Sequence, residues 1–222
     1  MLNLNNRNIR YKELIPEEKL NSIQATVVGV GAIGRQVVLQ LAAIGVPHIS
    51  IIDFDTVGVE NLGTQGFHES DIGRFKVDAV SDICRAINSK ININPSNTKF
   101  RPIQFIGGIL FCCVDRIDTR KSIYNAIGHR CDLFVDGRMS AEYLRVLSAF
   151  DDKSREYYLT TLFPQQEAYV GSCTAQTTIY CANIAAGFMV AQFIKWLRGC
   201  NLDMDVDINL LTNEMGVHQY EK

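Results

Sequence analysis

The stretch from Ala25 to Asp55 constrains the fold of this chain more than any other part of the sequence. It contains an apolar β-branched run, a turn of the form G-x-G-x-x-G, a helical pattern and a second apolar run that ends at Asp53. This order of strand, glycine turn, helix and parallel strand is the nucleotide-binding βαβ unit. The phosphates of a nucleotide would lie at the N-terminus of the helix, where unpaired N–H groups and the helix dipole favour anions.

Each glycine of the turn has its own expected role. Gly29 permits the tight turn, Gly31 lets backbone N–H groups approach a phosphate, and Gly34 lets the helix pack closely against the strand. Asp53 ends the second strand, where a carboxylate commonly accepts hydrogen bonds from a ribose. The alternative is a structural crossover whose glycines serve only for packing. The complete context favours a nucleotide site.

Length and composition indicate one sizeable α/β domain. The 222 residues are 47% hydrophobic, which is enough to fill a core without suggesting a membrane protein. The net charge of −2 gives no argument for nucleic acid or an anionic membrane as a partner. The seven cysteines contain no C-x-x-C pair, and residues 1–20 contain no apolar segment typical of a signal peptide. We therefore expect a cytoplasmic, reduced protein without a disulfide framework or a C-x-x-C zinc site.

Apolar runs and helical spacing predict a Rossmann-like open, mostly parallel sheet flanked by helices, with an antiparallel C-terminal extension. Strands are expected at 25–30, 48–53, 99–103, 109–114, 133–135, 143–150 and 205–212, and helices at 33–44, 71–90, 119–127 and 179–198. Residues 151–158 are expected to form a charged turn. Polar residues interrupt the long apolar helix at 179–198, so a buried or dimer-facing position is favoured over a membrane span.

A single domain, 1–222, accounts for this pattern. We expect an N-terminal arm at 1–23, a nucleotide-binding core at 24–136, and a C-terminal half at 137–222 with a crossover segment and the long helix. Asp53, Asp115 and Asp136 each follow a predicted strand, at the sheet edge where ligands bind in open α/β sheets. Three acids at one edge suggest a site that holds a cation as well as a nucleotide.

Several spaced motifs resemble the ThiF/MoeB/ubiquitin-activating-enzyme family of ATP-dependent adenylyltransferases. They lie in IIDFDTVGVENLGTQGFHESDIGRFKVDA, from Ile51, and in FCCVDRIDTR, from Phe111. After the glycine turn the matching residues are Asp53, Asp55, Asn61, Gln65, Lys76, Asp115 and Arg120. The resemblance covers residues 7–135 and is looser beyond them. Several motifs in the right order are far more specific than the glycines alone.

The resemblance implies that a carboxylate attacks the α-phosphate of ATP and releases pyrophosphate. In this family the carboxylate is usually the C-terminus of a ubiquitin-like or sulfur-carrier protein, and the enzyme is a homodimer. The resemblance implies that Asp53 holds the ribose, Lys76 contacts the phosphates and Asp115 binds Mg²⁺. The other nucleotide-binding residues would be Gly29, Gly31, Gly34, Asp55, Asn61 and Gln65.

Two of these roles have ordinary alternatives. Lys76 could be a solvated helix lysine, and Asp115 could be the N-cap of the helix that follows it. Their motif context favours the phosphate and metal roles.

The chain departs from the family pattern where an arginine is expected before Gln65. Thr64 stands there, so one phosphate-binding cation is missing. Arg74, or an N-terminal arginine of the partner subunit in a homodimer, would have to replace it. Arg10 is slightly favoured over Arg7 for the second role.

Cys173 is a candidate for a second chemical step. It lies in an expected irregular segment before the long helix, which resembles the position of the thioester-forming cysteine in some activating enzymes. A thiolate there could take the acyl group from the adenylate. The alternative is a buried structural cysteine.

Two other functions compete with adenylation. An NAD-dependent oxidoreductase would use the glycine turn and Asp53, but it gives no role to Asn61, Lys76 and Asp115 together. A non-catalytic subunit that pairs with an active enzyme would explain Thr64.

Overall fold

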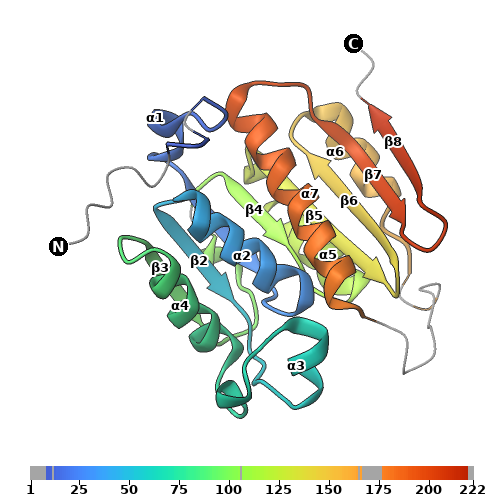
Figure 1. Cartoon of the computed structure of the whole chain (residues 1–222). Coiled ribbons are helices and arrows are strands. Elements are labelled where there is room, and N and C mark those ends of the chain that lie inside the picture. The colour runs from blue at the N-terminus through green and yellow to red at the C-terminus, as the bar shows by residue number, and fades with distance from the viewer. Residues whose placement is uncertain (1–8, 12, 106, 165, 167–176, 220–222) are drawn as a thin grey trace.

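The computed structural model describes every residue except 1–8, 12, 106, 165, 167–176 and 220–222. The described residues form an eight-stranded sheet in the order β3-β2-β1-β4-β5-β6-β7-β8 (Figure 1). The strands are β1 (Gln24–Val28), β2 (His48–Ile52), β3 (Asn92–Ser96), β4 (Ile109–Cys112), β5 (Leu133–Ser140), β6 (Tyr143–Ala149), β7 (Asp203–Asn209) and β8 (Glu214–Gln219). The helices are α1 (Glu17–Leu20), α2 (Ala32–Ile44), α3 (Glu60–Gln65), α4 (Lys76–Ile87), α5 (Ile117–Ile127), α6 (Asp152–Thr160) and α7 (Ile179–Arg198).

The sheet has a parallel half and an antiparallel half. Strands β3, β2, β1, β4 and β5 pair in parallel. Strands β6, β7 and β8 extend the sheet from β5 by antiparallel pairing. This arrangement confirms the predicted Rossmann-like sheet with an antiparallel C-terminal extension.

Helices cover both faces of the sheet. Figure 1 shows α2, α4 and α7 on the near face, and α5 and α6 lie behind it. In β1, Val27 packs into the cluster under α2, α4 and α7, whereas Val28 packs into the cluster with α5 and α6. Strands covered on both faces must be apolar on both, which explains their continuous apolar runs. With both faces covered, a ligand reaches the parallel strands at their carboxyl edge.

The long helix α7 is buried against the sheet, as predicted. It packs on α2 and on β5 and β6. Two of its polar residues, Gln192 and Lys195, both bind the Asp203 carboxylate, at 2.9 and 2.5 Å. Gly199 ends the helix with a φ of 71°, a conformation that glycine adopts without strain. Within the described ranges, no helix is both long and apolar enough to span a bilayer.

The predicted position of β3 is wrong. The strand is at Asn92–Ser96, and a short 3-10 helix, Pro102–Gln104, takes up the last two residues of the expected range of 99–103. Among the described residues β3 is an edge strand that pairs only with β2, so it needs no continuous apolar run and tolerates Pro95. A search for apolar runs therefore passes over it.

The C-terminal half differs from prediction in three places. Residues 151–158, expected to form a turn, mostly belong to helix α6, which Asp151 caps by accepting a hydrogen bond from the Ser154 N–H at 2.8 Å. β5 continues past the expected end at residue 135 because its residues up to Ser140 pair with β6. β8 was not predicted. The expected boundary between 24–136 and 137–222 therefore falls inside β5, and both parts share one sheet.

Candidate active site

A cleft of about 1490 Å³ opens at the carboxyl edge of the parallel strands. Residues that are distant in sequence meet there because neighbouring parallel strands end at the same edge. Seven of the residues predicted from sequence line it: Gly29, Gly31, Asp53, Asp55, Gln65, Lys76 and Asp115. This cleft is the candidate active site.

Two of the three glycines of the turn, Gly29 and Gly34, have no room for a side chain. Gly29 has a φ of 86°, and a Cβ there would lie 2.7 Å from the Cys113 carbonyl oxygen. A Cβ on Gly34 would lie 1.8 Å from the Gly29 carbonyl oxygen. Gly34 therefore serves the approach of α2 to β1 and does not line the cleft. Gly31 lines the cleft beside the Gln65 amide, whose oxygen has no hydrogen-bond donor among the described residues.

Asp53 connects the glycine turn to the loop after β2. One carboxylate oxygen accepts a hydrogen bond from the Val30 N–H at 2.7 Å, and the other accepts from the Asp55 N–H at 2.8 Å. Each carboxylate oxygen has two lone pairs, so the group can also accept hydrogen bonds from a ligand. Asp53 is thus suited to hold a ribose while it fixes both loops.

Lys76 places a buried positive charge in the cleft. It is the first residue of α4, and its side chain is 8% exposed. Its ammonium binds the Asp55 carboxylate at 3.1 Å, and its backbone N–H donates to the Asp55 carbonyl at 3.0 Å. The alternative of a solvated helix lysine is wrong. An ammonium held in this way is suited to contact phosphate oxygens.

Asp115 lies between β4 and α5 with an exposed carboxylate in the cleft. The N-cap of α5 is Arg116, so the alternative role of Asp115 as a helix cap is wrong. In the described part of the chain, its carboxylate accepts no hydrogen bond. It is available to a cation. The same part of the chain contains no cluster of three acidic, histidine or cysteine side chains, so Mg²⁺ would need phosphate oxygens and water as further ligands.

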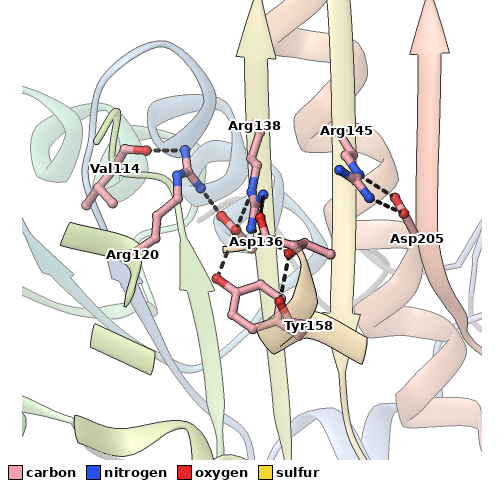
Figure 2. Close-up of polar contacts among 8 residues, drawn as sticks. Val114, Arg120, Asp136, Arg138, Arg145, Tyr158 and Asp205 are labelled. Carbon is pink, nitrogen blue, oxygen red and sulfur yellow. Dashed lines mark hydrogen bonds and ion pairs between the residues drawn. The ribbon is translucent and has the colours of Figure 1, made fainter. Parts of the chain in front are cut away.

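Asp136 does not join the other acids at the edge. It is fully buried, and its carboxylate accepts hydrogen bonds from Arg120, from Arg138 Nε at 2.8 Å and from the Tyr158 hydroxyl at 3.0 Å (Figure 2). The suggestion that three acids hold a cation is therefore wrong. It assumed that β5 ends before Asp136, whereas the strand runs on to Ser140.

Comparison with known proteins identifies the family of this chain. The model of the ThiF family matches residues 5–220. The chain belongs to the ThiF family. Curated relatives include the molybdopterin-synthase adenylyltransferase of Salmonella typhimurium, 32% identical over 113 residues, which cover 48% of this chain and 45% of that protein. The adenylyltransferase and sulfurtransferase MOCS3 of Culex quinquefasciatus is 39% identical over 155 residues, covering 66% of this chain and 34% of that protein. This ThiF-family chain thus spans less than half the length of these two relatives.

Solved structures share the ThiF-type fold at low sequence identity. The crystal structure of E. coli MccB with AMPCPP and MccA has a TM-score of 0.76 and 16% identity, and the match covers 98% of this chain and 72% of that one. PaaA has a TM-score of 0.73 and 18% identity, covering 91% of this chain and 74% of that one. These likenesses support the fold.

Other residues expected from the family pattern lie outside the cleft. Asn61 is buried, and its side-chain oxygen accepts from the Gly58 N–H at 2.9 Å, which fixes the start of α3. Thr64 donates its hydroxyl to the Glu60 carbonyl at 2.7 Å. Arg74 binds Asp71 and Asp82 and does not line the cleft, so it does not replace the missing arginine. Asn61 thus has a structural role in its own loop, and its expected binding role stays a prediction.

Two of the expected catalytic residues, Arg10 and Cys173, are not among the described residues that line the cleft. Arg10 is exposed and does not line it. If Arg10 contacts ATP, it would have to do so in the cleft of another subunit. Cys173 lies outside the described residues.

The far end of the cleft contains two arginines that sequence reasoning missed. Arg138 on β5 and Arg145 on β6 are directly paired in the antiparallel register, and both line the cleft. Arg145 binds Asp205 with two hydrogen bonds, at 2.9 and 2.6 Å (Figure 2), and the Tyr157 hydroxyl donates to the same carboxylate at 2.6 Å. No motif marks these residues, because their proximity depends on strand pairing.

The Asp205 contacts predict a pH dependence of stability. Burial alone would raise the pKa of Asp205, but the hydrogen bonds from Arg145 and Tyr157 outweigh it and hold this pKa below its usual range. Such a carboxyl stabilises the fold above its unfolded-state pKa of about 4, and this contribution is lost as the pH falls through the folded-state pKa. We expect the difference in unfolding free energy between wild type and Asp205→Asn to be largest near neutral pH and to shrink in acid. Urea titrations across the acidic range measure it, and a constant difference would contradict the prediction.

Proposed function

We propose that this ThiF-family chain activates a carboxylate by adenylation, in which the carboxylate attacks the α-phosphate of ATP and pyrophosphate leaves. The observation that supports this most is the meeting of the glycine turn, Asp53, Lys76 and Asp115 in one cleft. A carboxylate is already ionised at neutral pH, so the reaction needs no general base. Its rate would depend on positioning and on stabilisation of charge.

The order of the strands suggests how ATP is held. Asp53, at the end of β2, would accept hydrogen bonds from the ribose hydroxyls. The turn after β1 would offer backbone N–H groups to a phosphate at the start of α2. Lys76 would stabilise negative charge on the phosphates, and it is already held in place by Asp55.

Asp115 is the residue best suited to hold Mg²⁺. Its carboxylate is exposed in the cleft and accepts no hydrogen bond from the described residues, so its oxygens are available to a hard cation. Bound Mg²⁺ would offset the charge of the phosphate oxygens.

The carboxylate we propose is the C-terminus of a ubiquitin-like or sulfur-carrier protein. Two curated relatives are named as a molybdopterin-synthase adenylyltransferase and as an adenylyltransferase and sulfurtransferase, which supports this class of substrate. We further propose a cytoplasmic homodimer in which Arg10 of one subunit acts at the cleft of the other. The Cys173 thiolate would then attack the acyl adenylate, so that a thioester forms, the acyl–phosphate bond breaks and AMP leaves.

Calorimetric titration of ATP with Mg²⁺, and separately of NAD, tests the nucleotide assignment, with Asp115→Ala as the comparison. We expect wild type to bind ATP more tightly with Mg²⁺ than without, and Asp115→Ala to lose at least about tenfold of that affinity, as loss of a charged contact predicts. Lys121→Ala is a matched control, because Lys121 is exposed on α5 and does not line the cleft.

Other outcomes would favour the competing functions. Binding of NAD with no response to Mg²⁺ would overturn adenylation in favour of an oxidoreductase. Binding of neither nucleotide would indicate a non-catalytic subunit, or a site that a partner completes. Release of pyrophosphate by the isolated protein with a carboxylate substrate would exclude the non-catalytic subunit.

A further inference from the structure

Asp136 is an unusual residue to place in the core. It has no exposed surface, and it receives hydrogen bonds from two arginines, one of them Arg120, which is itself buried. Burying charges costs free energy, and well-packed apolar residues often stabilise a core as well or better. The chain nevertheless keeps two guanidiniums and one carboxylate between the sheet and the helices behind it, which calls for a role beyond packing.

One arm of this network ends at the backbone beside Asp115. Arg120 donates one hydrogen bond to Asp136 and another to the carbonyl oxygen of Val114 (Figure 2). On the other side of this short loop, the Cys113 N–H donates to the Val28 carbonyl at 2.8 Å. Hydrogen bonds therefore hold the backbone at Cys113 and at Val114, the two residues that precede Asp115.

The other arm ends at the far part of the cleft. Arg138 lines the cleft and donates to Asp136 at 2.8 Å, to the Thr161 carbonyl at 2.8 Å and to the Thr161 hydroxyl at 3.0 Å. The hydroxyl of Tyr158, which lies with Thr161 at the C-terminal end of α6, also donates to Asp136. The buried Asp136 carboxylate therefore connects the loop that carries Asp115, strand β5 and the C-terminal end of α6.

We propose that Asp136 is a positioning residue for the metal-binding end of the cleft, acting through Arg120 and the Val114 carbonyl to set the direction of the Asp115 carboxylate. The proposal rests on the proposed function, since it assigns Asp136 to support of the Mg²⁺ ligand. Groups that orient a metal ligand from outside the coordination shell commonly change metal affinity by 10- to 100-fold. Asp136 touches neither nucleotide nor metal, so its effect is on Mg²⁺ dependence.

The test compares two buried carboxylates of the same kind. Asp136→Asn removes the charge that holds Arg120. Asp205→Asn is the matched control, because Asp205 is 1% exposed and likewise accepts from an arginine and a tyrosine, but it has no contact with the Asp115 loop. The measurement is the Mg²⁺ concentration that gives half-maximal ATP binding, determined by calorimetry on the full chain, together with the thermal unfolding of each variant.

We expect both variants to unfold at lower temperature, and Asp136→Asn alone to need roughly tenfold more Mg²⁺. Equal Mg²⁺ requirements for Asp136→Asn and wild type, or equal shifts in both variants, would overturn the proposal. If Asp136→Asn does not fold, Arg120→Lys takes its place, because its single ammonium cannot reproduce both contacts of the guanidinium. An unchanged Mg²⁺ requirement in Arg120→Lys would also overturn it. Wild type that binds no ATP would instead overturn the proposed function itself.

Discussion

Replacing Lys76 with alanine is expected to slow ATP-dependent adenylation by roughly 100- to 1000-fold, the range found when a group that stabilises transition-state charge is removed. Lys76 is a buried cation that lines the cleft together with the glycine turn and the loop after β2. The departing pyrophosphate gains negative charge as the bond to the α-phosphate breaks, and a fixed ammonium stabilises that charge more in the transition state than in bound ATP. Pyrophosphate exchange with the carboxylate substrate measures the effect.

The fold should tolerate this substitution. The partner of Lys76, Asp55, has a side chain that is 50% exposed, so water can solvate its carboxylate when the ammonium is removed. We expect the thermal unfolding of Lys76→Ala to stay close to that of wild type, and Lys121→Ala to change neither property. A variant that retains activity within threefold would show that Lys76 does not contact the reacting phosphates.

Arg120→Ala should have the largest effect on stability, a loss of about 3–5 kcal/mol in the free energy of unfolding, as found when one partner of a buried ion pair is removed. The substitution leaves the Asp136 carboxylate in the core with fewer donors, and it leaves the Val114 carbonyl without the guanidinium. Burial lowers the pKa of Arg120, yet a guanidinium stays charged in proteins, so the pair is ionic in the folded state. Denaturant unfolding monitored by circular dichroism measures the loss.

Arg116→Ala is the matched control for this experiment. Its side chain is 62% exposed, and it contacts a carboxylate only at 3.9 Å, to Asp118. An exposed substitution of this kind changes stability by about 0.5 kcal/mol or less. If Arg120→Ala were no more destabilising than Arg116→Ala, the buried network would not hold α5 against the sheet.

The sequence was most informative where local pattern and chemistry coincide. The glycine turn, Asp53 and Lys76 were predicted because each belongs to a motif with a fixed place at the end of a strand or the start of a helix. β3 was misplaced because an edge strand needs little apolar surface. α6 was missed because its charged residues obscure the few that are buried, among them Tyr158.

Local sequence patterns could not identify site residues that are brought together by strand pairing or by packing. Arg138 and Arg145 meet through the antiparallel pairing of β5 with β6, which no short motif encodes. Asp136 was assigned to the ligand edge because the apolar run stops before it, and its two arginine partners could not be foreseen from spacing. Asn61 matched a motif, but its side chain is used within its own loop.

The position of β1 between β2 and β4 has a consequence for synthesis on the ribosome. β2 follows β1 closely in sequence, whereas β4 is made much later, so β1 has an unpaired edge until β4 emerges. An unpaired edge of a nascent chain is exposed to wrong partners during that interval. The glycine turn also packs against the Cys113 backbone directly after β4. In a nascent chain that stops before that cysteine, the side of the glycine turn that later faces Cys113 is therefore still uncovered, although its hydrogen bonds to Ile52 and Asp53 can already form.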